Sequence, residues 1–254
     1  MKQFLYGIVY KLWYPVVLAF IAVSTSFFGI IVIIVGLIPF IDRDANFGNL
    51  IGRLWSWLNL KVVMTRVDLI GKEKIDRDRS YIVMLNHQSH FDVWALIAYM
   101  PLQLRWVMKK ELRHIPIFGY GCSQLGMIYI DRRDSEKARK SLEAAKKKIT
   151  DSGVSVVFFP EGTRSCDGNL LEFKKGGFVM ALATNTPILP VTVNGSRYAL
   201  PKGRPFSMKP GRIELIIHDP IEVEGMTYED RNELMAKIKG IISSKMDMEY
   251  GKQY

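Results

Sequence analysis

The stretch YIVMLNHQSHFD, residues 81–92, contains the pattern that decides the fold. Its first half is a continuous apolar run, which is typical of a strand buried on both faces of a parallel sheet. Ser89 and Asp92 then match the Ser-x-x-Asp pattern of helix N-termini, directly before the apolar run from Val93 to Tyr99. A buried strand that leads through a short turn into a helix is the repeating unit of α/β folds.

Apolar runs and amphipathic runs alternate along the rest of the chain from Lys61. We predict strands at 61–70, 81–85, 104–108, 126–130, 154–159, 188–193 and 213–218, and helices at 90–99, 135–151, 175–185 and 229–246. This alternation predicts an α/β fold with a mostly parallel mixed sheet flanked by helices. No internal repeat or linker divides this part, so we expect one domain over residues 61–254.

The N-terminal part is strongly apolar. Residues 15–41 contain no ionisable side chain. A helix of this length extends roughly 40 Å, whereas a bilayer core needs only about 20 residues. The segment is also too long for the apolar region of a cleaved signal peptide. Two arrangements stay open: the segment spans the bilayer, or it bends near Ser24–Ser26 and Gly29 and remains in one leaflet.

A second helix is expected just after this segment. Apolar residues recur there at spacings of three and four and form one helical face, which comprises Phe47, Leu50, Ile51, Leu54, Trp55 and Leu58. This face either packs on the core of the following domain or lies at a membrane interface, with Trp55 and Trp57 at headgroup depth. With the apolar segment it predicts an N-terminal helical membrane-anchoring module over residues 1–60.

The charge of the chain indicates a polyanionic partner. There are 35 Lys and Arg residues against 25 Asp and Glu residues, a formal net charge of +10. Nucleic acid, anionic membrane and phosphorylated substrates would all suit this excess. The apolar segment favours a lipid surface, because cations beside a membrane segment are attracted to anionic lipids. The two cysteines, Cys122 and Cys166, have no metal-ligand spacing, and we expect two free thiols.

His87 and Asp92 are candidates for acid–base chemistry. On a straight helix they would point about 140° apart. With Ser89 as N-cap, however, His87 lies in the turn before the helix and Asp92 in its first turn, where a bend brings them together. A carboxylate bonded to one imidazole nitrogen leaves the other nitrogen as a base. A solvated surface histidine is the alternative. A zinc site with His90 would need further ligands that no Cys or His pair supplies, so no metal is predicted.

The second candidate segment is FPEGTRS, residues 159–165. It follows the apolar run at 154–159, at the end of a buried strand, where α/β sheets place their sites. Gly162 allows a ligand to approach closely, Thr163 adds a hydroxyl, and Arg164 offers a planar fork that matches phosphate. A plain glycine turn would not explain why Glu161 and Arg164 flank the glycine. The absence of Walker A and Gly-x-Ser-x-Gly sequences argues against nucleotide hydrolysis and serine-hydrolase chemistry.

These segments resemble the conserved blocks of a known enzyme family. NHQSHFD resembles the NHxSxxD block of the glycerolipid acyltransferases, whose signature is HxxxxD, and FPEGTRS resembles their third block. GMIYIDR, residues 126–132, resembles the second block, and PILPV, residues 187–191, the fourth. Lys109 in MKKEL and Lys174 in FKKG also match recurring positions. The four blocks occur in the family order, and within the family they are most similar to the lysophosphatidic acid acyltransferases.

The resemblance implies a reaction and its site. His87 would be the general base, oriented by Asp92, and backbone N–H groups near Gly162 would stabilise the oxyanion. The residues implied in substrate binding are Lys109, Arg132, Glu161, Gly162, Thr163, Arg164 and Lys174. The alternative for Glu161 is that it orients Arg164 or the loop. The enzyme would transfer a fatty acyl chain from an acyl-CoA or acyl carrier protein thioester to the sn-2 hydroxyl of 1-acylglycerol-3-phosphate, with no permanently bound cofactor.

The resemblance also implies partners and a location. The expected partners are the lysophospholipid, the acyl thioester and membrane lipid, without nucleic acid, and the catalytic domain is expected on the cytoplasmic side. One alternative is an enzyme of the same family that acts on another lysophospholipid or on glycerol 3-phosphate. Another is a non-catalytic basic protein that binds membrane or RNA. This alternative leaves His87, Asp92 and FPEGTRS unexplained, and no aromatic-rich RNA-binding motif supports it.

Overall fold

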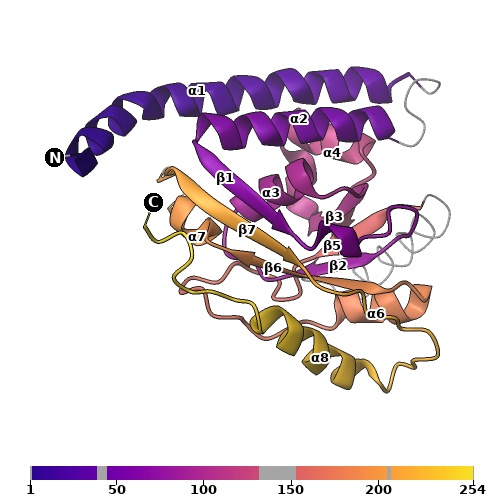
Figure 1. Ribbon diagram of the computed structural model, residues 1–254. Helices are drawn as coiled ribbons and strands as arrows, with labels where there is room; N and C mark the ends of the chain where they lie inside the picture. Colours follow the sequence, from indigo (N-terminus) through magenta and orange to yellow (C-terminus); the bar gives the residue numbers. More distant parts are fainter. Residues whose placement is uncertain (1, 39–44, 132–152, 205–206, 254) are drawn as a thin grey trace.

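A computed structural model of the protein describes residues 2–38, 45–131, 153–204 and 207–253 (Figure 1). Its centre is a seven-stranded sheet in the order β1-β7-β6-β2-β5-β3-β4. Every neighbouring pair is parallel except β6 and β7, which are antiparallel. The predicted α/β fold with a mostly parallel mixed sheet is therefore confirmed. The strands are β1 Thr65–Ile70, β2 Ile82–Leu85, β3 Leu104–Lys109, β4 Ile128–Ile130, β5 Ser155–Phe158, β6 Ile188–Asn194 and β7 Gly211–Ile217.

Helices cover both faces of this sheet (Figure 1). The α-helices are α1 Lys2–Gly36, α2 Asn46–Val62, α3 Phe91–Tyr99, α4 Phe118–Gln124, α6 Gly176–Thr184, α7 Ser196–Ala199 and α8 Arg231–Ser243, and the 3-10 helices are η1 Lys72–Lys74 and η2 Lys110–His114. β2 shows how the two layers arise, because its side chains alternate between two hydrophobic clusters. Val83 and Leu85 belong to the cluster that includes residues of α1, α2 and α3, whereas Ile82 and Met84 belong to the cluster with α6 and α8.

Most predicted elements are present, with one clear boundary error. The predicted helices at 90–99, 175–185 and 229–246 correspond to α3, α6 and α8. The strand predicted from residue 61 begins only at Thr65, because α2 continues to Val62 and Met64 adopts a positive φ of 58° in the turn. The short helices α4 and α7 were not predicted. The predicted helix at 135–151 lies outside the described residues.

α1 is a single helix that continues through the serine- and glycine-containing stretch where a bend was considered. The Thr25 hydroxyl donates to the Ile21 carbonyl at 2.6 Å, and the Ser26 hydroxyl donates to the Ala22 carbonyl at 3.0 Å. Ser24 donates to Asn59 Oδ1 of α2 at 3.0 Å. These polar groups therefore find acceptors without breaking the helix. Among the described residues, α1 is the one helix long and apolar enough to cross a membrane, with a mean hydropathy of 2.7 for the span Leu12–Gly36.

α2 exposes one part of its apolar face and buries another part against the core. Phe47, Leu50 and Leu54 are 46%, 60% and 47% exposed. The buried residues of this helix are Gly48, Ile51, Ser56, Asn59 and Leu60. The outward stripe, Phe47, Leu50 and Leu54, agrees with an interfacial role, whereas Ile51 is buried in the core and Trp55 packs on Trp94 of α3. Each of the two interpretations that the sequence left open therefore holds for part of the predicted face.

The N-terminal helices share a core with the sheet. Val17 of α1 and Leu60 of α2 are fully buried in the same hydrophobic cluster as Val83 of β2 and Phe91 of α3. Figure 1 shows α1 and α2 lying together across one side of the sheet. The helices that would contact lipid are therefore packed directly onto the layer that carries the histidine motif.

Candidate active site

The two candidate segments begin side by side at one edge of the sheet. β2 and β5 are parallel neighbours, with Met84 opposite Phe158, so the chain leaves both strands at their carboxyl ends. The loop after β2 carries His87, and the loop after β5 carries Glu161 and Arg164. This is the edge at which parallel α/β sheets place their ligands, as the sequence predicted.

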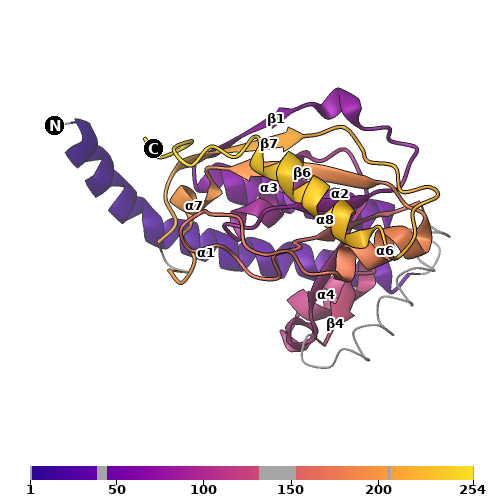
Figure 2. The same cartoon turned by 90° about the horizontal axis from the view of Figure 1, so that it is seen from below.

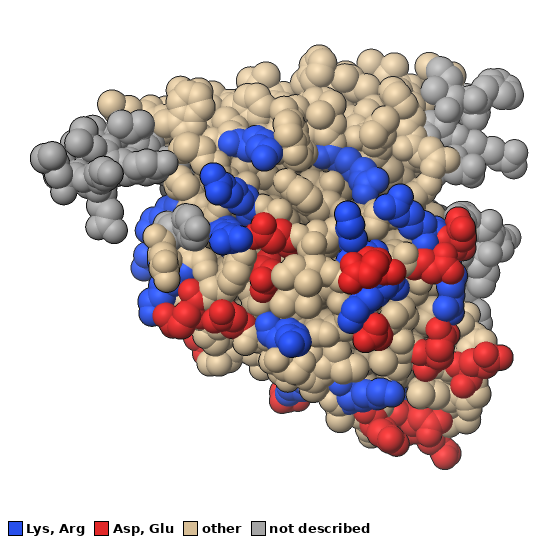
Figure 3. Space-filling model, viewed as in Figure 1, with Lys and Arg blue, Asp and Glu red and all other residues tan. Residues whose placement is uncertain are grey.

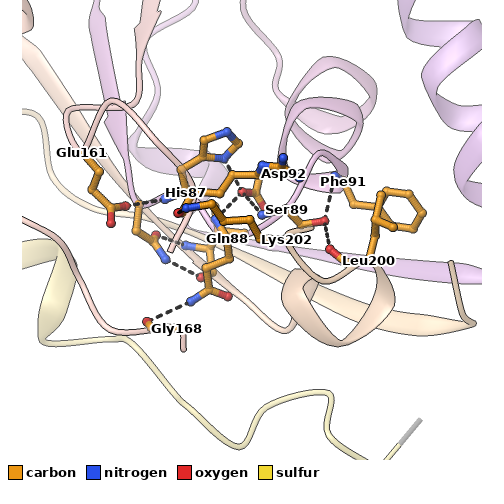
Figure 4. Close-up of polar contacts among 12 residues, drawn as sticks. His87, Gln88, Ser89, Phe91, Asp92, Glu161, Gly168, Leu200 and Lys202 are labelled. Atoms are coloured by element: carbon orange, nitrogen blue, oxygen red, sulfur yellow. Dashed lines mark hydrogen bonds and ion pairs between the residues drawn. The ribbon is translucent and has the colours of Figure 1, made fainter. Parts of the chain in front are cut away.

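His87 and Asp92 are in contact, as the bend before the helix predicted. His87 Nδ1 lies 2.8 Å from Asp92 Oδ2 (Figure 4). The Asp92 side chain is fully buried, and that of His87 is 14% exposed. Oδ2 of Asp92 also accepts the backbone N–H groups of Gln88 at 2.8 Å and Ser89 at 2.9 Å. These bonds hold the carboxylate in place, so it fixes Nδ1 of the imidazole as the protonated nitrogen.

Ser89 supports the start of α3 but does not occupy the predicted N-cap position. The helix begins at Phe91, and His90 precedes it as N-cap. The Ser89 hydroxyl accepts the Phe91 N–H at 3.2 Å and donates to the Leu200 carbonyl at 2.8 Å. The cap therefore lies one residue later than predicted, in a turn whose Gln88 and Ser89 N–H groups both donate to the carboxylate of Asp92.

The FPEGTRS loop holds the His87 peptide at both of its polar groups. Glu161 Oε1 accepts the His87 N–H at 2.6 Å, and the Ser165 N–H donates to the His87 carbonyl at 2.7 Å. The ring of Phe159 stacks on the imidazole, with 3.7 Å between the ring centroids and an interplanar angle of 19°. The second candidate segment therefore fixes the position of the first.

Glu161 is committed to the main chain. Its second oxygen, Oε2, accepts the Leu171 N–H at 2.9 Å, so each carboxylate oxygen already has a donor. The residue is 3% exposed. Burial raises the pKa of Glu161 to about 7, although the two N–H bonds act in the opposite direction. This geometry suits a residue that positions the loop, which is the alternative that the sequence left open beside a role in substrate binding.

Gly162 adopts the left-handed conformation that its position in the turn requires. Its φ is 70°, and a Cβ added here would lie 2.8 Å from Lys174 Nζ. Its N–H donates to the Phe159 carbonyl at 2.9 Å. That N–H therefore has an acceptor inside the loop, and the predicted oxyanion role is left to other N–H groups near Gly162. The glycine instead lets the ammonium of Lys174 lie directly against the loop.

Several cations surround this edge. The pKa of His90 is lowered by desolvation and then by the positive charge of Arg164, which places the guanidinium near the histidine motif. Lys109 ends β3, the strand next to β5, and is exposed, as is Thr163. Arg132 lies outside the described residues. The described residues contain no group of three His, Cys, Asp or Glu side chains arranged to hold a metal ion.

Comparison with known proteins identifies the family of this chain. A family model described as Acyltransferase matches residues 66–194, slightly more than half of the 254 residues. The chain belongs to the acyltransferase family. The resemblance of its four blocks to this family is thereby confirmed.

Relatives of this acyltransferase have names that agree with one another. The chloroplastic 1-acyl-sn-glycerol-3-phosphate acyltransferase BAT2 of Brassica napus is 32% identical over 179 residues, which cover 69% of this chain and 51% of that protein. A 1-acyl-sn-glycerol-3-phosphate acyltransferase of Limnanthes alba is 30% identical over 223 residues, which cover 88% and 78%. The chain thus spans about half the length of the Brassica protein and most of the Limnanthes one.

A solved structure is similar over nearly the whole chain. It is the crystal structure of the 1-acyl-sn-glycerophosphate (LPA) acyltransferase PlsC from Thermotoga maritima, with a TM-score of 0.80 and 28% sequence identity. The similarity covers 94% of this acyltransferase and 95% of that chain, so it includes the N-terminal helices as well as the sheet.

Two residues that the sequence analysis missed help to build the site of this acyltransferase. The Asn86 side chain bonds the main chain of β6 just beyond the end of β2. Its amide N–H donates to the Val193 carbonyl at 2.8 Å, and its amide oxygen accepts the Val193 N–H at 2.7 Å. Lys202 donates to the Arg164 carbonyl at 2.6 Å. The buried asparagine directly after an apolar strand was a usable signal. Nothing local in the sequence links Lys202 to Arg164.

Proposed function

We propose that this acyltransferase moves a fatty acyl chain from an acyl thioester to the sn-2 hydroxyl of 1-acylglycerol-3-phosphate, which makes phosphatidic acid. The observation that carries the proposal is the 2.8 Å contact between His87 Nδ1 and Asp92 Oδ2 at the carboxyl edge of the sheet. The choice of acceptor is supported by the names of the relatives from Brassica, Limnanthes and Thermotoga.

His87 acts as the general base. Because Asp92 binds Nδ1–H, Nε2 holds the lone pair that takes the proton from the acceptor hydroxyl as its oxygen attacks the thioester carbonyl. Collapse of the tetrahedral intermediate breaks the C–S bond, and the imidazolium gives its proton to the departing thiolate, which leaves as the thiol. The buried carboxylate of Asp92 stabilises the imidazolium meanwhile. No covalent acyl-enzyme is needed, because the thiol of the carrier is already a good leaving group.

Cations at the same edge bind the acceptor phosphate. Arg164 is the principal candidate, because its charge acts on the histidine motif and its planar fork matches phosphate oxygens. Lys174, which lies against Gly162, and Lys109 at the end of β3 add positive charge. Thr163 is exposed in the same loop as Arg164, and Arg132 is the last residue of the second block, GMIYIDR. The acyl donor is a CoA or carrier protein thioester, and the chain uses no resident cofactor or metal.

The acceptor is a lipid, and the protein meets it at a membrane. The exposed face of α1 and the outward stripe of α2 form an uncharged region at the top of Figure 3, with Lys and Arg side chains gathered beneath it. Lys61 illustrates the boundary, because its ammonium lies 5.4 Å from the centre of the Trp57 ring. Aromatic and cationic residues in this order suit a lipid interface. The catalytic domain faces the cytoplasm, where acyl thioesters are found.

The test is a thiol-release assay with the purified full-length protein in detergent. Acyl-CoA and acyl carrier protein are each offered with lysophosphatidic acid, with other lysophospholipids and with glycerol 3-phosphate. We expect thiol release with lysophosphatidic acid, and loss of about 10²–10⁴-fold in kcat for His87→Ala, since that is the range for a general base. Near-normal turnover by a folded His87→Ala protein would refute the mechanism. A preference for another acceptor would refute only the substrate assignment.

A further inference from the structure

We propose that residues 109–120 form a second membrane-contacting element, which inserts an apolar tip into the lipid interface beside α1. The apolar tip consists of Ile115, Pro116 and Tyr120. The inference rests on the membrane association included in the proposed function and extends it to a part of the fold far from the N-terminus.

The tip exposes apolar surface that the protein itself does not cover. Ile115 is 45% exposed and Tyr120 is 50% exposed, and Pro116 between them is exposed as well. Single exposed apolar residues are ordinary, whereas a contiguous group of them marks an interaction site. The neighbouring glycines of α4, Gly119 and Gly121, are buried, so the helix is seated firmly while the tip points away.

This tip lies beside α1. Ile117, in the middle of the segment, packs so closely on α1 that a Cβ added at Gly29 would lie 2.6 Å from its Cγ2. In the same part of α1, but turned about 100–160° around the helix from Gly29, Phe27, Ile30 and Ile34 are 57%, 45% and 53% exposed. Figure 2 shows α4 and β4 projecting beside the C-terminal half of α1. A lipid surface that meets this half of α1 is therefore also within reach of the tip.

The backbone of the tip is held in an unusual conformation. Ile117 has φ 62° and ψ −58°, a region that β-branched residues rarely adopt. The Phe118 N–H donates to the Pro116 carbonyl at 2.6 Å, and the Gly119 N–H donates to the Ile115 carbonyl at 2.8 Å. This tight turn places Ile117 against α1 and leaves Ile115 outside. Strain of this kind persists where surrounding contacts impose it, and it is common at functional sites.

The charges beside the apolar tip favour an anionic lipid surface as its binding partner. Lys109, Lys110 and Arg113 are exposed on the chain that leads to the tip, with Glu111 as the one acidic residue among them. Lys110 lies 4.0 Å from Asp131, whereas Arg113 forms no ion pair with another described residue and faces no such competition for a phosphate group. Cations behind an exposed apolar tip, with a tyrosine at its edge, match the order of an anionic headgroup layer above acyl chains.

The location connects this contact to catalysis. Lys109 ends β3, which is parallel to β5, so the segment leaves the sheet at the edge that carries His87. A lipid contact at the tip would turn this edge toward the bilayer from which a lysophospholipid must come. The segment would thus guide the acceptor, whereas α1 and α2 provide the main anchor.

The experiment measures the depth of single probes in vesicles. In a Cys166→Ser background, an NBD label is attached to Ile115→Cys, to Ile34→Cys on α1, or to Tyr228→Cys. The remaining thiol, Cys122, should stay unlabelled, because burial raises its pKa to about 12. Tyr228 is the matched control: it is 60% exposed and precedes α8, which packs on the other face of the sheet. The vesicles contain phosphatidylcholine and phosphatidylglycerol with doxyl groups on their acyl chains.

We expect the probes at positions 115 and 34 to be quenched and the probe at position 228 to stay unquenched. Quenching at position 34 alone would overturn the inference and leave the α1 anchor standing. Absence of quenching at all three positions would overturn membrane association itself. Thiol release, measured on the same samples in detergent, reports separately whether the proposed acyl transfer occurs.

A second variant tests the catalytic consequence. Ile115→Ser with Tyr120→Ser should lower kcat/KM for lysophosphatidic acid in vesicles about tenfold, because two apolar contacts with lipid are lost. In detergent micelles, where the substrate is dispersed, the same protein should match the wild type. Equal activity of the variant and the wild type in vesicles would contradict the proposal.

Discussion

Replacing Glu161 by Gln should change the stability and the activity of this protein in opposite directions as the pH rises. The wild-type carboxylate accepts the His87 N–H at 2.6 Å and the Leu171 N–H at 2.9 Å. Gln keeps one carbonyl oxygen, but its amide nitrogen cannot accept a hydrogen bond. One of the two main-chain N–H groups therefore loses its hydrogen bond to residue 161. If that group belongs to His87, the imidazole moves relative to the substrate hydroxyl that it deprotonates.

The stability effect depends on pH. Burial raises the pKa of Glu161 from 4.5 to about 7, so between these values the folded state binds more protons than the unfolded state. The contribution of the Glu161 carboxyl to the free energy of unfolding is complete below pH 4.5 and is lost as the pH rises through 7. For a pKa shift of this size the loss is roughly 3 kcal/mol. The Gln variant carries no such charge. Its free energy of unfolding, relative to the wild type, should therefore rise between pH 5 and pH 8.

The activity effect has the opposite direction. Above pH 7 the wild-type carboxylate holds both N–H groups, and the variant should show a lower kcat with little change in KM for the acceptor. Below pH 7 the protonated wild-type side chain resembles Gln, so the ratio of the two kcat values should approach one. Urea unfolding and thiol release, each measured from pH 5 to pH 8.5, provide both profiles.

Glu172→Gln is the control, because the Glu172 side chain lies near the same loop but is 93% exposed and pairs with Lys239. It should leave both profiles unchanged. If Glu161→Gln raised KM at constant kcat, Glu161 would contact the substrate and the positioning role would be wrong. A stability difference that does not change with pH would show that the carboxyl is ionised across the whole range.

Three further changes test separate parts of the site. Asp92→Asn should lower kcat by about 10²–10⁴-fold at similar KM, because the imidazolium loses its buried counter-charge, and stopped-flow or steady-state thiol release would measure this. Arg164→Ala should raise KM for lysophosphatidic acid roughly 10- to 100-fold, and a collapsed kcat at constant KM would instead assign the guanidinium to the transition state. Gly162→Ala should cost about 1–2 kcal/mol in urea unfolding, because φ is 70° there, and should also raise KM by displacing Lys174. Gly225→Ala has the same kind of backbone strain with nothing within 4 Å, so it should lower stability alone.

The sequence predicted those features that depend on local pattern. Apolar runs located the buried strands, because a strand covered by helices on both faces has few polar side chains. The contact of His87 with Asp92 followed from the turn that must precede a helix starting near Ser89. Both inferences use residues within a few positions of each other, where chain geometry leaves few alternatives.

Features that depend on distant partners were missed. Two roles stayed open for Glu161 in its own loop, and the choice between them depends on the His87 N–H, 74 positions earlier, which lies next to it. Lys202 reaches the Arg164 carbonyl across 38 positions. α2 illustrates the same limit, because its helical period was recognised but the side that faces inward depends on Ser24 of α1 bonding Asn59.

The shared core makes anchoring and catalysis parts of one rigid arrangement. Val17 and Leu60 of the N-terminal helices are buried in the cluster that holds Phe91, and Phe91 is adjacent to Asp92 on α3. Deleting residues 1–60 would therefore expose the core beside the active site, and loss of activity in such a protein would report unfolding as much as loss of the anchor. Exposed positions such as Leu50 and Leu54 on α2 offer a cleaner change, because their side chains contribute little to the core. Replacing both with Ser should weaken vesicle binding and leave turnover in detergent intact. Equal loss in vesicles and in detergent would mean that the outward stripe of α2 supports the fold, and that lipid contact is made elsewhere.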